Sequence, residues 1–115
     1  MSEPLDIRHL RELFEDDMGS LLQLVNEAVD RSRILIEQID RFAAERSSES
    51  IGAAHELRGL LKTIGAQELA SLSDDLEDLA RSERWSDVLH RSAQLHDAHK
   101  RFEAAAAGLA NPRSD

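Results

Sequence analysis

The chain has 115 residues, of which 41% are hydrophobic, 32% are charged and only 3% are aromatic, and its formal net charge is −9. This length fits one domain with a single core. The acidic balance excludes nucleic acid as a main partner, because phosphate binding needs a clustered positive surface. The lack of cysteine excludes disulfides and thiolate metal sites. No apolar run approaches the roughly 20 residues that span a membrane, and the first residues lack the basic and apolar regions of a signal peptide, so we expect a cytoplasmic protein.

A short helix and then a long one are expected in the first part of the chain. Proline occurs only at positions 4 and 112, so nothing interrupts a long helix between them. The first helix is expected over residues 6–14, with a buried side formed by Leu5, His9 or Leu10, and Leu13. The second extends from residue 18 to about residue 46, because small and apolar residues recur there at spacings of three and four. These residues are Met18, Leu21, Leu22, Val25, Ala28, Val29, Ser32, Leu35, Ile36, Ile39, Phe42 and Ala43.

Three further helices follow, separated by short polar turns. The third begins near Ser48 or Ser50, and its buried stripe comprises Ile51, Ala54, Leu57, Leu61 and Ile64. Gly65 is a candidate for the left-handed residue that ends this helix. The fourth helix has the stripe Leu69, Leu72, Leu76 and Leu79. The last has the heptad stripe Val88, Leu95, Phe102 and Leu109.

Helices joined by short turns predict an all-α fold, an antiparallel four-helix bundle with a short additional N-terminal helix. No segment shows the sustained alternation of a strand. We expect a single helical domain over residues 1–115, with a frayed tail over residues 109–115.

The stretch GAAHELRG places two of the five glycines of the chain around one histidine. At about 100° per residue, His55 lies about 120° from the centre of the buried stripe of its helix, so it is expected outside the core or at its margin. The residues on the same side are Gly52, Gly59, Lys62 and Ala66. Each interior glycine costs a helix about 1 kcal/mol relative to alanine, so helix stability does not explain the two glycines.

Two interpretations of His55 are open. A solvated side chain is the ordinary one for a lone surface histidine, but it leaves the glycines to chance. A histidine that reacts with a group held by another protein needs clearance, which glycine provides, and neutral imidazole is a good nucleophile near neutral pH. Arg58 and Lys62 are close enough along the helix to stabilise an anion placed on this histidine.

Glu77 is the expected partner of His55. If the turn between the third and fourth helices centres on Ala66, the two residues lie 11 positions before and after it. Antiparallel helices bring them level, about 16 Å from the turn. The carboxylate would accept a hydrogen bond from one ring nitrogen, fix the tautomer and leave the other nitrogen free to react. The alternative is a solvated glutamate beside the apolar stripe.

These residues resemble the signature of the histidine phosphotransfer (HPt) domain family. That signature is a histidine, a Lys or Arg three residues later, then a glycine, and further on an apolar residue, a glycine and a small residue. The chain carries it in AAHELRGLLKTIGAQELASLSDDLE, residues 53–77. The matching positions are His55, Leu57, Arg58, Gly59, Ile64, Gly65, Ala66, Leu69 and Leu76. The flanking helices are also similar to the family bundle, so the resemblance covers nearly the whole chain.

The resemblance implies a phosphorelay in two-component signal transduction. His55 would accept phosphate from an aspartate of one receiver domain, in a response regulator or hybrid sensor kinase, and relay it to another. Arg58 would support it electrostatically and Gly59 by clearance, and Glu77 falls where the family often carries a Gln or Glu that orients the ring. The chain would be a monomeric phosphocarrier and not an enzyme, with no ATP-binding module and no cofactor of its own, and the receiver domain would supply Mg²⁺.

The chain departs from the family where small residues often follow the signature glycine. Leu60, Leu61 and Lys62 stand there instead. Leu61 fits the buried stripe, whereas Leu60 and Lys62 are expected, with Gly52 and Gly59, on the partner surface. Two other functions stay open: a non-phosphorylated adaptor, or degenerate HPt domain, that binds a receiver or kinase through the same surface, and a dimerising bundle with a purely structural role. Neither requires a histidine at this position.

Metal binding is not expected. His96 and His99 have a spacing of three that can chelate a metal, but they lie on different sides of their helix and no third ligand is evident, so we expect core-edge or solvated histidines. Leu24 and Ile34 lie off the stripe of the long helix, and would extend a docking patch if that helix neighbours the His55 face.

Overall fold

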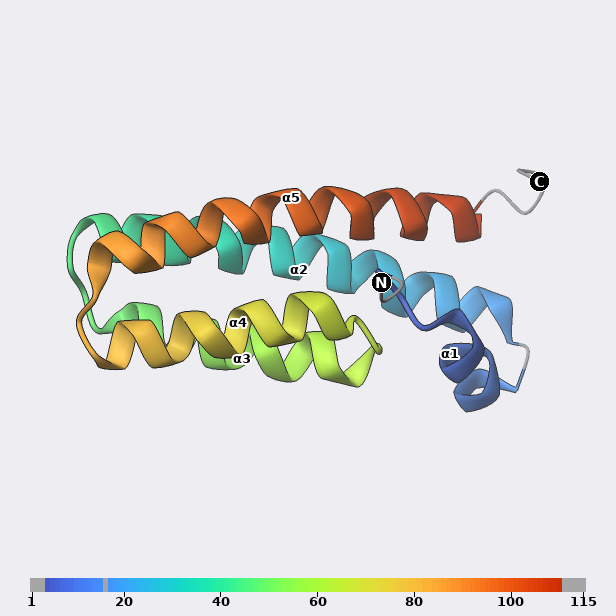
Figure 1. Ribbon diagram of the computed structural model, residues 1–115. Coiled ribbons are helices and arrows are strands. Elements are labelled where there is room, and N and C mark those ends of the chain that lie inside the picture. The colour runs from blue at the N-terminus through green and yellow to red at the C-terminus, as the bar shows by residue number, and fades with distance from the viewer. Residues whose placement is uncertain (1–3, 16, 111–115) are drawn as a thin grey trace.

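The computed structural model describes residues 4–15 and 17–110, and within them it contains five helices and no strand. They are α1 (Ile7–Phe14), α2 (Met18–Ala44), α3 (Glu49–Thr63), α4 (Gln67–Arg81) and α5 (Trp85–Ala110). Figure 1 shows α2 to α5 lying lengthwise against one another, with α1 beside the N-terminal end of α2. The predicted all-α fold, an antiparallel four-helix bundle with a short N-terminal helix, is confirmed.

The four bundle helices form a long pair and a short pair. α2 and α5 have 27 and 26 residues, whereas α3 and α4 have 15 each. At about 1.5 Å per residue the α3–α4 hairpin covers little more than half of the long pair, as Figure 1 shows. The chain before α2 packs beyond the end of this hairpin, where Leu5 and Leu10 are buried.

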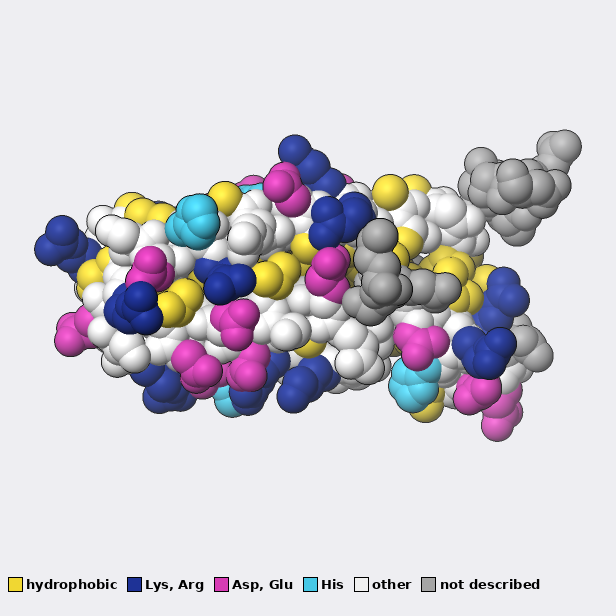
Figure 2. Space-filling model, in the orientation of Figure 1, with side chains coloured by type: hydrophobic (Ala, Val, Ile, Leu, Met, Phe, Trp, Pro, Cys, Tyr) yellow, Lys and Arg dark blue, Asp and Glu magenta, His cyan; other side chains and the backbone are white. Residues whose placement is uncertain are grey.

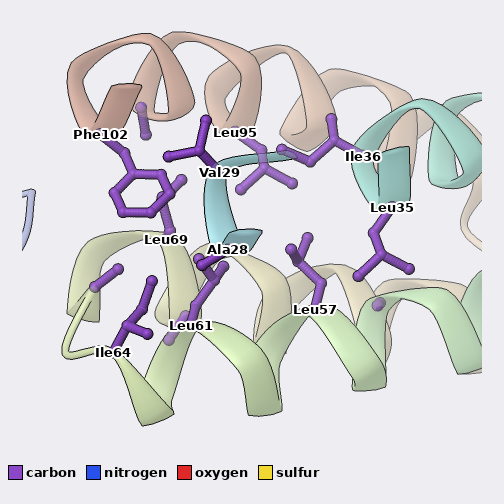
Figure 3. Packing of buried hydrophobic residues seen from close by; sticks show 14 of the residues in the cluster. Ala28, Val29, Leu35, Ile36, Leu57, Leu61, Ile64, Leu69, Leu95 and Phe102 are labelled. Carbon is purple, nitrogen blue, oxygen red and sulfur yellow. The ribbon is translucent and has the colours of Figure 1, made fainter. Parts of the chain in front are cut away.

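The hydrophobic core lies where the bundle helices face one another. α5 contributes the stripe that its heptad spacing predicts, which is buried throughout: Val88, Leu95, Phe102 and Leu109. Figure 3 shows Leu57 of α3, Leu69 of α4 and Phe102 of α5 meeting in the same interior. Burying a side chain of this size contributes about 1.5–3 kcal/mol, so this shared core holds α3 in a fixed rotation about its axis.

The turn between α3 and α4 sets the register of the hairpin. Gly65 has a φ of 75°, the left-handed conformation that favours glycine. The next N–H, of Ala66, donates to the carbonyl of Leu61 at 2.9 Å. The sequence prediction that Gly65 ends the third helix is therefore confirmed. Because the turn is this short, residues equally far before and after it lie level in the hairpin.

α1 differs in detail from the prediction. It begins at Ile7, and Asp6 caps it by accepting a hydrogen bond from the backbone N–H of His9 at 3.0 Å. Leu13, predicted on the buried side, is 58% exposed. The reason is the length of α1: eight residues make about two turns, and only Leu10 in the helix is fully buried.

The ends of the long helices also differ from the prediction. α2 ends at Ala44, two residues before the predicted end. α5 continues through Ala110 with Leu109 only 8% exposed, because that leucine completes the heptad stripe. The predicted frayed tail therefore begins too early, and its residues 111–115 lie outside the described part of the chain. None of the described helices combines the length and apolar character needed to cross a membrane.

Candidate functional site

His55 lies in the middle of α3 and points away from the core. Its side chain is 61% exposed, whereas its neighbours Ala54 and Leu57 are buried. The sequence prediction that this histidine lies outside the buried stripe is confirmed. Exposure is the first requirement for a side chain that reacts with another protein.

The glycines beside His55 leave open space. A Cβ atom built on Gly52 or Gly59 would meet no described atom within 4 Å, apart from the local helix backbone. Gly65 is different, because a Cβ there would lie 3.0 Å from the Cβ of Asp6. Packing against another part of the fold therefore requires neither Gly52 nor Gly59, and the surface on which they lie is free for a partner to approach closely.

Two residues assigned to this surface are less exposed than predicted. Ala66 is fully buried, because α3 ends before it and the wheel of α3 does not extend past Thr63. Leu60 is partly buried and packs against the hydrophobic core, so it contributes less to the exposed surface than predicted. Lys62 is exposed, as predicted.

Glu77 of α4 makes the predicted contact with His55. Its Oε1 lies 3.1 Å from Nδ1 of the imidazole. The glutamate is only 6% exposed, which corrects the expectation that it lies beside the buried face. α4 packs against both α3 and α5, so it buries more than one stripe, formed by Leu69, Ala70, Ser73, Leu76, Glu77 and Ala80.

Arg81 holds the other oxygen of this carboxylate. Its Nε and Nη2 donate to Oε2 of Glu77 at 3.2 and 2.7 Å. The Arg81 hydrogen bonds lower the pKa of Glu77 most, the His55 contact lowers it further, and burial opposes both. The sequence analysis missed Arg81, although a glutamate followed four residues later by an arginine is a favourable helix pair.

The ionised carboxylate decides the tautomer of His55. An ionised glutamate only accepts hydrogen bonds, so the contact with Glu77 is satisfied when Nδ1 carries the proton and donates it. The lone pair of the neutral ring then lies on Nε2. No described residue forms a hydrogen bond with Nε2, so this nitrogen is available as a nucleophile.

Arg58 lies between His55 and a second carboxylate. Its Nη1 donates to Oδ1 of Asp74 at 2.7 Å, and its Nη2 lies 3.3 Å from Nδ1 of His55. The ring proton already occupies Nδ1, so we assign the second contact to electrostatic attraction between Arg58 and Glu77, whose Oε1 is 3.9 Å from Nη1. This pairing was not predicted from the sequence. The register contains the signal, because Arg58 and Asp74 lie eight positions before and after Ala66.

The neighbouring surface of α2 carries one exposed apolar side chain. Arg31 of α2 pairs with Glu56 of α3 at 2.7 Å, which places the two helices side by side next to His55. Ile34, one turn along α2, is 45% exposed. Leu24 is partly buried against the core. Of the two apolar residues predicted to extend a docking patch, Ile34 is the more accessible.

The histidines of α5 form separate contacts. His96 Nε2 lies 2.6 Å from Oδ2 of Asp40, whereas His99 Nε2 lies 2.8 Å from the hydroxyl of Ser32 and its Nδ1 lies 2.8 Å from Glu103. His99 is 4% exposed, so it is a buried residue and not a core-edge one. Among the described residues, no group of three or more His, Asp or Glu side chains is placed to hold a metal ion.

The view in Figure 2 shows acidic and basic side chains intermingled over α4 and α5. A nucleic-acid-binding surface instead gathers its cations into a patch or stripe. The electrostatics of this face therefore resemble those of an ordinary solvated surface.

The comparisons with known proteins were made at the level of families, curated proteins and solved structures. A family model described as Hpt domain matches residues 9–106. No curated protein and no solved structure matches the chain. The matched range extends from α1 nearly to the end of α5, and it includes His55 and all of the side chains around it.

Proposed function

The chain belongs to the Hpt domain family, whose members carry phosphate on a histidine in phosphorelays, and from this premise we propose that His55 accepts the phosphoryl group. The donor is an aspartyl phosphate of one receiver domain, and the acceptor is the aspartate of another. The observation that carries this assignment is an imidazole with a 61% exposed side chain and its Nδ1 held 3.1 Å from a buried carboxylate.

The tautomer of His55 suits the transfer step. The lone pair of Nε2 attacks phosphorus, the N–P bond forms, and the P–O bond to the aspartyl carboxylate breaks, so the aspartate leaves as an anion. The proton on Nδ1 stays in place, and the ring gains positive charge as the N–P bond forms. Glu77, already ionised and oriented, stabilises that charge without reorganisation. Transfer to the second receiver is the same step in reverse.

The open surface beside His55 suits docking of the receiver domain. In-line transfer requires the nucleophile, phosphorus and leaving oxygen to lie nearly on one line. Side chains at positions 52 and 59 would project into that approach, and Gly52 and Gly59 have none. Two residues of this chain would border the docked receiver domain: Ile34 of α2 would offer an apolar contact, and Lys62 of α3 would offer a positive charge.

The remaining chemistry belongs to the partner. We propose that the chain acts as a monomeric carrier with no cofactor of its own, and that the receiver domain supplies Mg²⁺ together with the aspartate. The carrier contributes a positioned nucleophile.

A labelling experiment with a matched histidine tests the proposal. The protein is incubated with a radiolabelled, phosphorylated receiver domain, and acid-labile label on the chain is measured. We expect label on the unaltered chain and on His90→Gln, which changes another exposed histidine, and none on His55→Gln. Undiminished labelling of His55→Gln would assign the phosphate elsewhere. Tight binding of the receiver domain without any label on the unaltered chain would indicate the adaptor function instead.

A further inference from the structure

Arg58 is engaged by Asp74 before any phosphate arrives. The hydrogen bond between them is 2.7 Å long, and the Arg58 side chain is 28% exposed. This bond is the main reason that the pKa of the Arg58 guanidinium is raised above its ordinary value. The nearest cation to His55 is therefore partly neutralised in the unphosphorylated chain.

A phosphoryl group on His55 would be a second ligand for the same guanidinium. A phosphorylated side chain carries a charge of about −1.5 to −2 and three strong acceptor oxygens. Arg58 lies one turn from His55 with Nη2 at 3.3 Å from the ring, so a change of side-chain rotamer brings its donors towards that group. Because the five N–H groups form one rigid fork, a rotamer change that turns them towards the phosphate weakens the bond between Nη1 and Asp74.

We propose that Asp74 competes with the phosphoryl group of phosphorylated His55 for Arg58, and thereby sets how strongly this domain retains phosphate. The inference rests on the proposed function, because it requires phosphate on His55. A carrier that must pass phosphate onward gains from such competition, since a phosphoryl group bound too tightly would not leave. Asp74 is thus a positioning residue that acts through Arg58.

The other acidic residues of α4 do not fill this role. Glu77 is occupied by His55 and Arg81, as described above. Asp75 lies 3.9 Å from Arg91 of α5, and therefore faces a different helix. Asp78 influences the pKa of Arg58 only through its charge at longer range. Among these residues Asp74 alone hydrogen bonds to Arg58.

A chemical phosphodonor tests the inference without a receiver domain. Phosphoramidate transfers its phosphoryl group to a histidine and releases ammonia, so docking plays no part. The measurement is the ³¹P NMR intensity of phosphohistidine relative to the total concentration of the chain, which gives the steady-state ratio of phosphorylated to unphosphorylated chain. We expect Asp74→Asn to raise this ratio about two- to five-fold, the range that the strength of exposed ion pairs allows. Asp75→Asn removes the same charge one residue away and should leave the ratio unchanged, and Asp74→Glu should stay close to the unaltered chain.

A second set of variants tests whether the effect passes through Arg58. In an Arg58→Ala background, Asp74→Asn should have no effect on the ratio, because the shared ligand is gone. An undiminished effect in that background, or equal effects of Asp74→Asn and Asp75→Asn, would overturn the competition. If His55 takes up no phosphate in a folded, unaltered chain, the proposed function fails and the competition fails with it. Labelling of His55 that is insensitive to Asp74 overturns the competition alone.

Discussion

The chain uses the same two groups, a histidine and a glutamate, in two regions with opposite burial. On the α3–α4 hairpin the histidine is exposed and the glutamate is buried, with side-chain exposures of 61% for His55 and 8% for Glu77. Between α2 and α5 the order is reversed, with 5% for His99 and 40% for Glu103. The first pair leaves its ring open to solvent, and the second fixes a ring inside the fold.

The difference lies in the second ring nitrogen. Burial lowers the pKa of His99, which favours the neutral ring near neutral pH; its Nδ1 lies 2.8 Å from Glu103, and its Nε2 lies 2.8 Å from the hydroxyl of Ser32 of α2. Both nitrogens are used, and the ring links two helices. At His55 the carboxylate occupies one nitrogen, and no residue in the described part of the chain forms a hydrogen bond with the other. We therefore expect a histidine–carboxylate pair to be available for reaction when its histidine is the exposed member, and to be structural when its histidine is buried.

The largest expected effect comes from changing each histidine to glutamine. His55→Gln should lose phosphate uptake completely while its free energy of unfolding changes by less than about 0.5 kcal/mol, because this is a surface position. His99→Gln should keep uptake and lose about 1–3 kcal/mol of stability, because a buried hydrogen-bonding position is disturbed. Receiver-dependent labelling and urea unfolding measure the two quantities. Loss of label in His99→Gln, or unfolding of His55→Gln, would contradict the contrast between an exposed, reacting His55 and a buried, structural His99.

The next largest effect is expected from filling the space beside His55. Gly59→Leu should slow transfer from a receiver domain about 100-fold, because small misplacements of an in-line geometry have effects of that size. The same change should stabilise the isolated domain by somewhat under about 1 kcal/mol, because it replaces a mid-helix glycine. Transfer rates and urea unfolding should thus move in opposite directions.

Gly108→Leu is the matched control for this substitution. A Cβ at that position of α5 also meets no described atom within 4 Å, apart from the local helix backbone. It should not affect transfer, since α5 takes no part in the His55 surface. A Gly59→Leu variant that loses stability would mean that this glycine is packed after all. Normal transfer in the same variant would mean that it does not clear the approach.

A smaller effect is expected from removing only the charge of Glu77. Glu77→Gln keeps an acceptor oxygen for Nδ1–H and loses the charge that stabilises the ring during transfer. A charge-assisted hydrogen bond is worth roughly twice a neutral one, so uptake from phosphoramidate should slow about five-fold. Glu77→Ala, which also removes the acceptor, should slow it more. Equal rates in the two variants would show that orientation alone matters.

The sequence predicted the parts of this arrangement that periodic patterns determine. The buried stripe of α5 follows from the regular repeat of a helix. The side-by-side placement of His55 and Glu77 follows from the short turn, which fixes the register of the α3–α4 hairpin. The predictions for Leu13 and Ala66 were wrong because the regular helix pattern does not apply at these two positions. The first lies in a helix too short to bury a full stripe, and the second lies beyond the end of its helix.

The pairings of long charged side chains did not follow from the sequence. Arg58 has several acidic residues within reach on α4; the register brings Asp74 level with it, and the packed structure selects that residue. The burial of His99 was also missed, because a histidine near an apolar stripe is as compatible with the surface as with the interior. The Arg58–Asp74 pairing and the burial of His99 depend on the rotation of neighbouring helices, which periodicity alone does not give.

The smallest effects expected are those of pH on stability, and they separate the two regions. His99 has a pKa below 6.5 in the folded chain, so as the pH falls through 6.5 the unfolded chain binds a proton first and stability decreases. The pKa of Glu77 is lowered from 4.5, so its contribution is present above that pH and is lost only as the pH falls below it. Because each group binds at most one proton, each loss is at most about 1.4 kcal/mol per pH unit. Urea unfolding between neutral and acid pH should therefore show two successive losses, of which His99→Gln removes the first and Glu77→Gln the second. If His99→Gln kept the first loss, the ring between α2 and α5 would already be charged in the folded chain, and the contrast with His55 would no longer rest on burial.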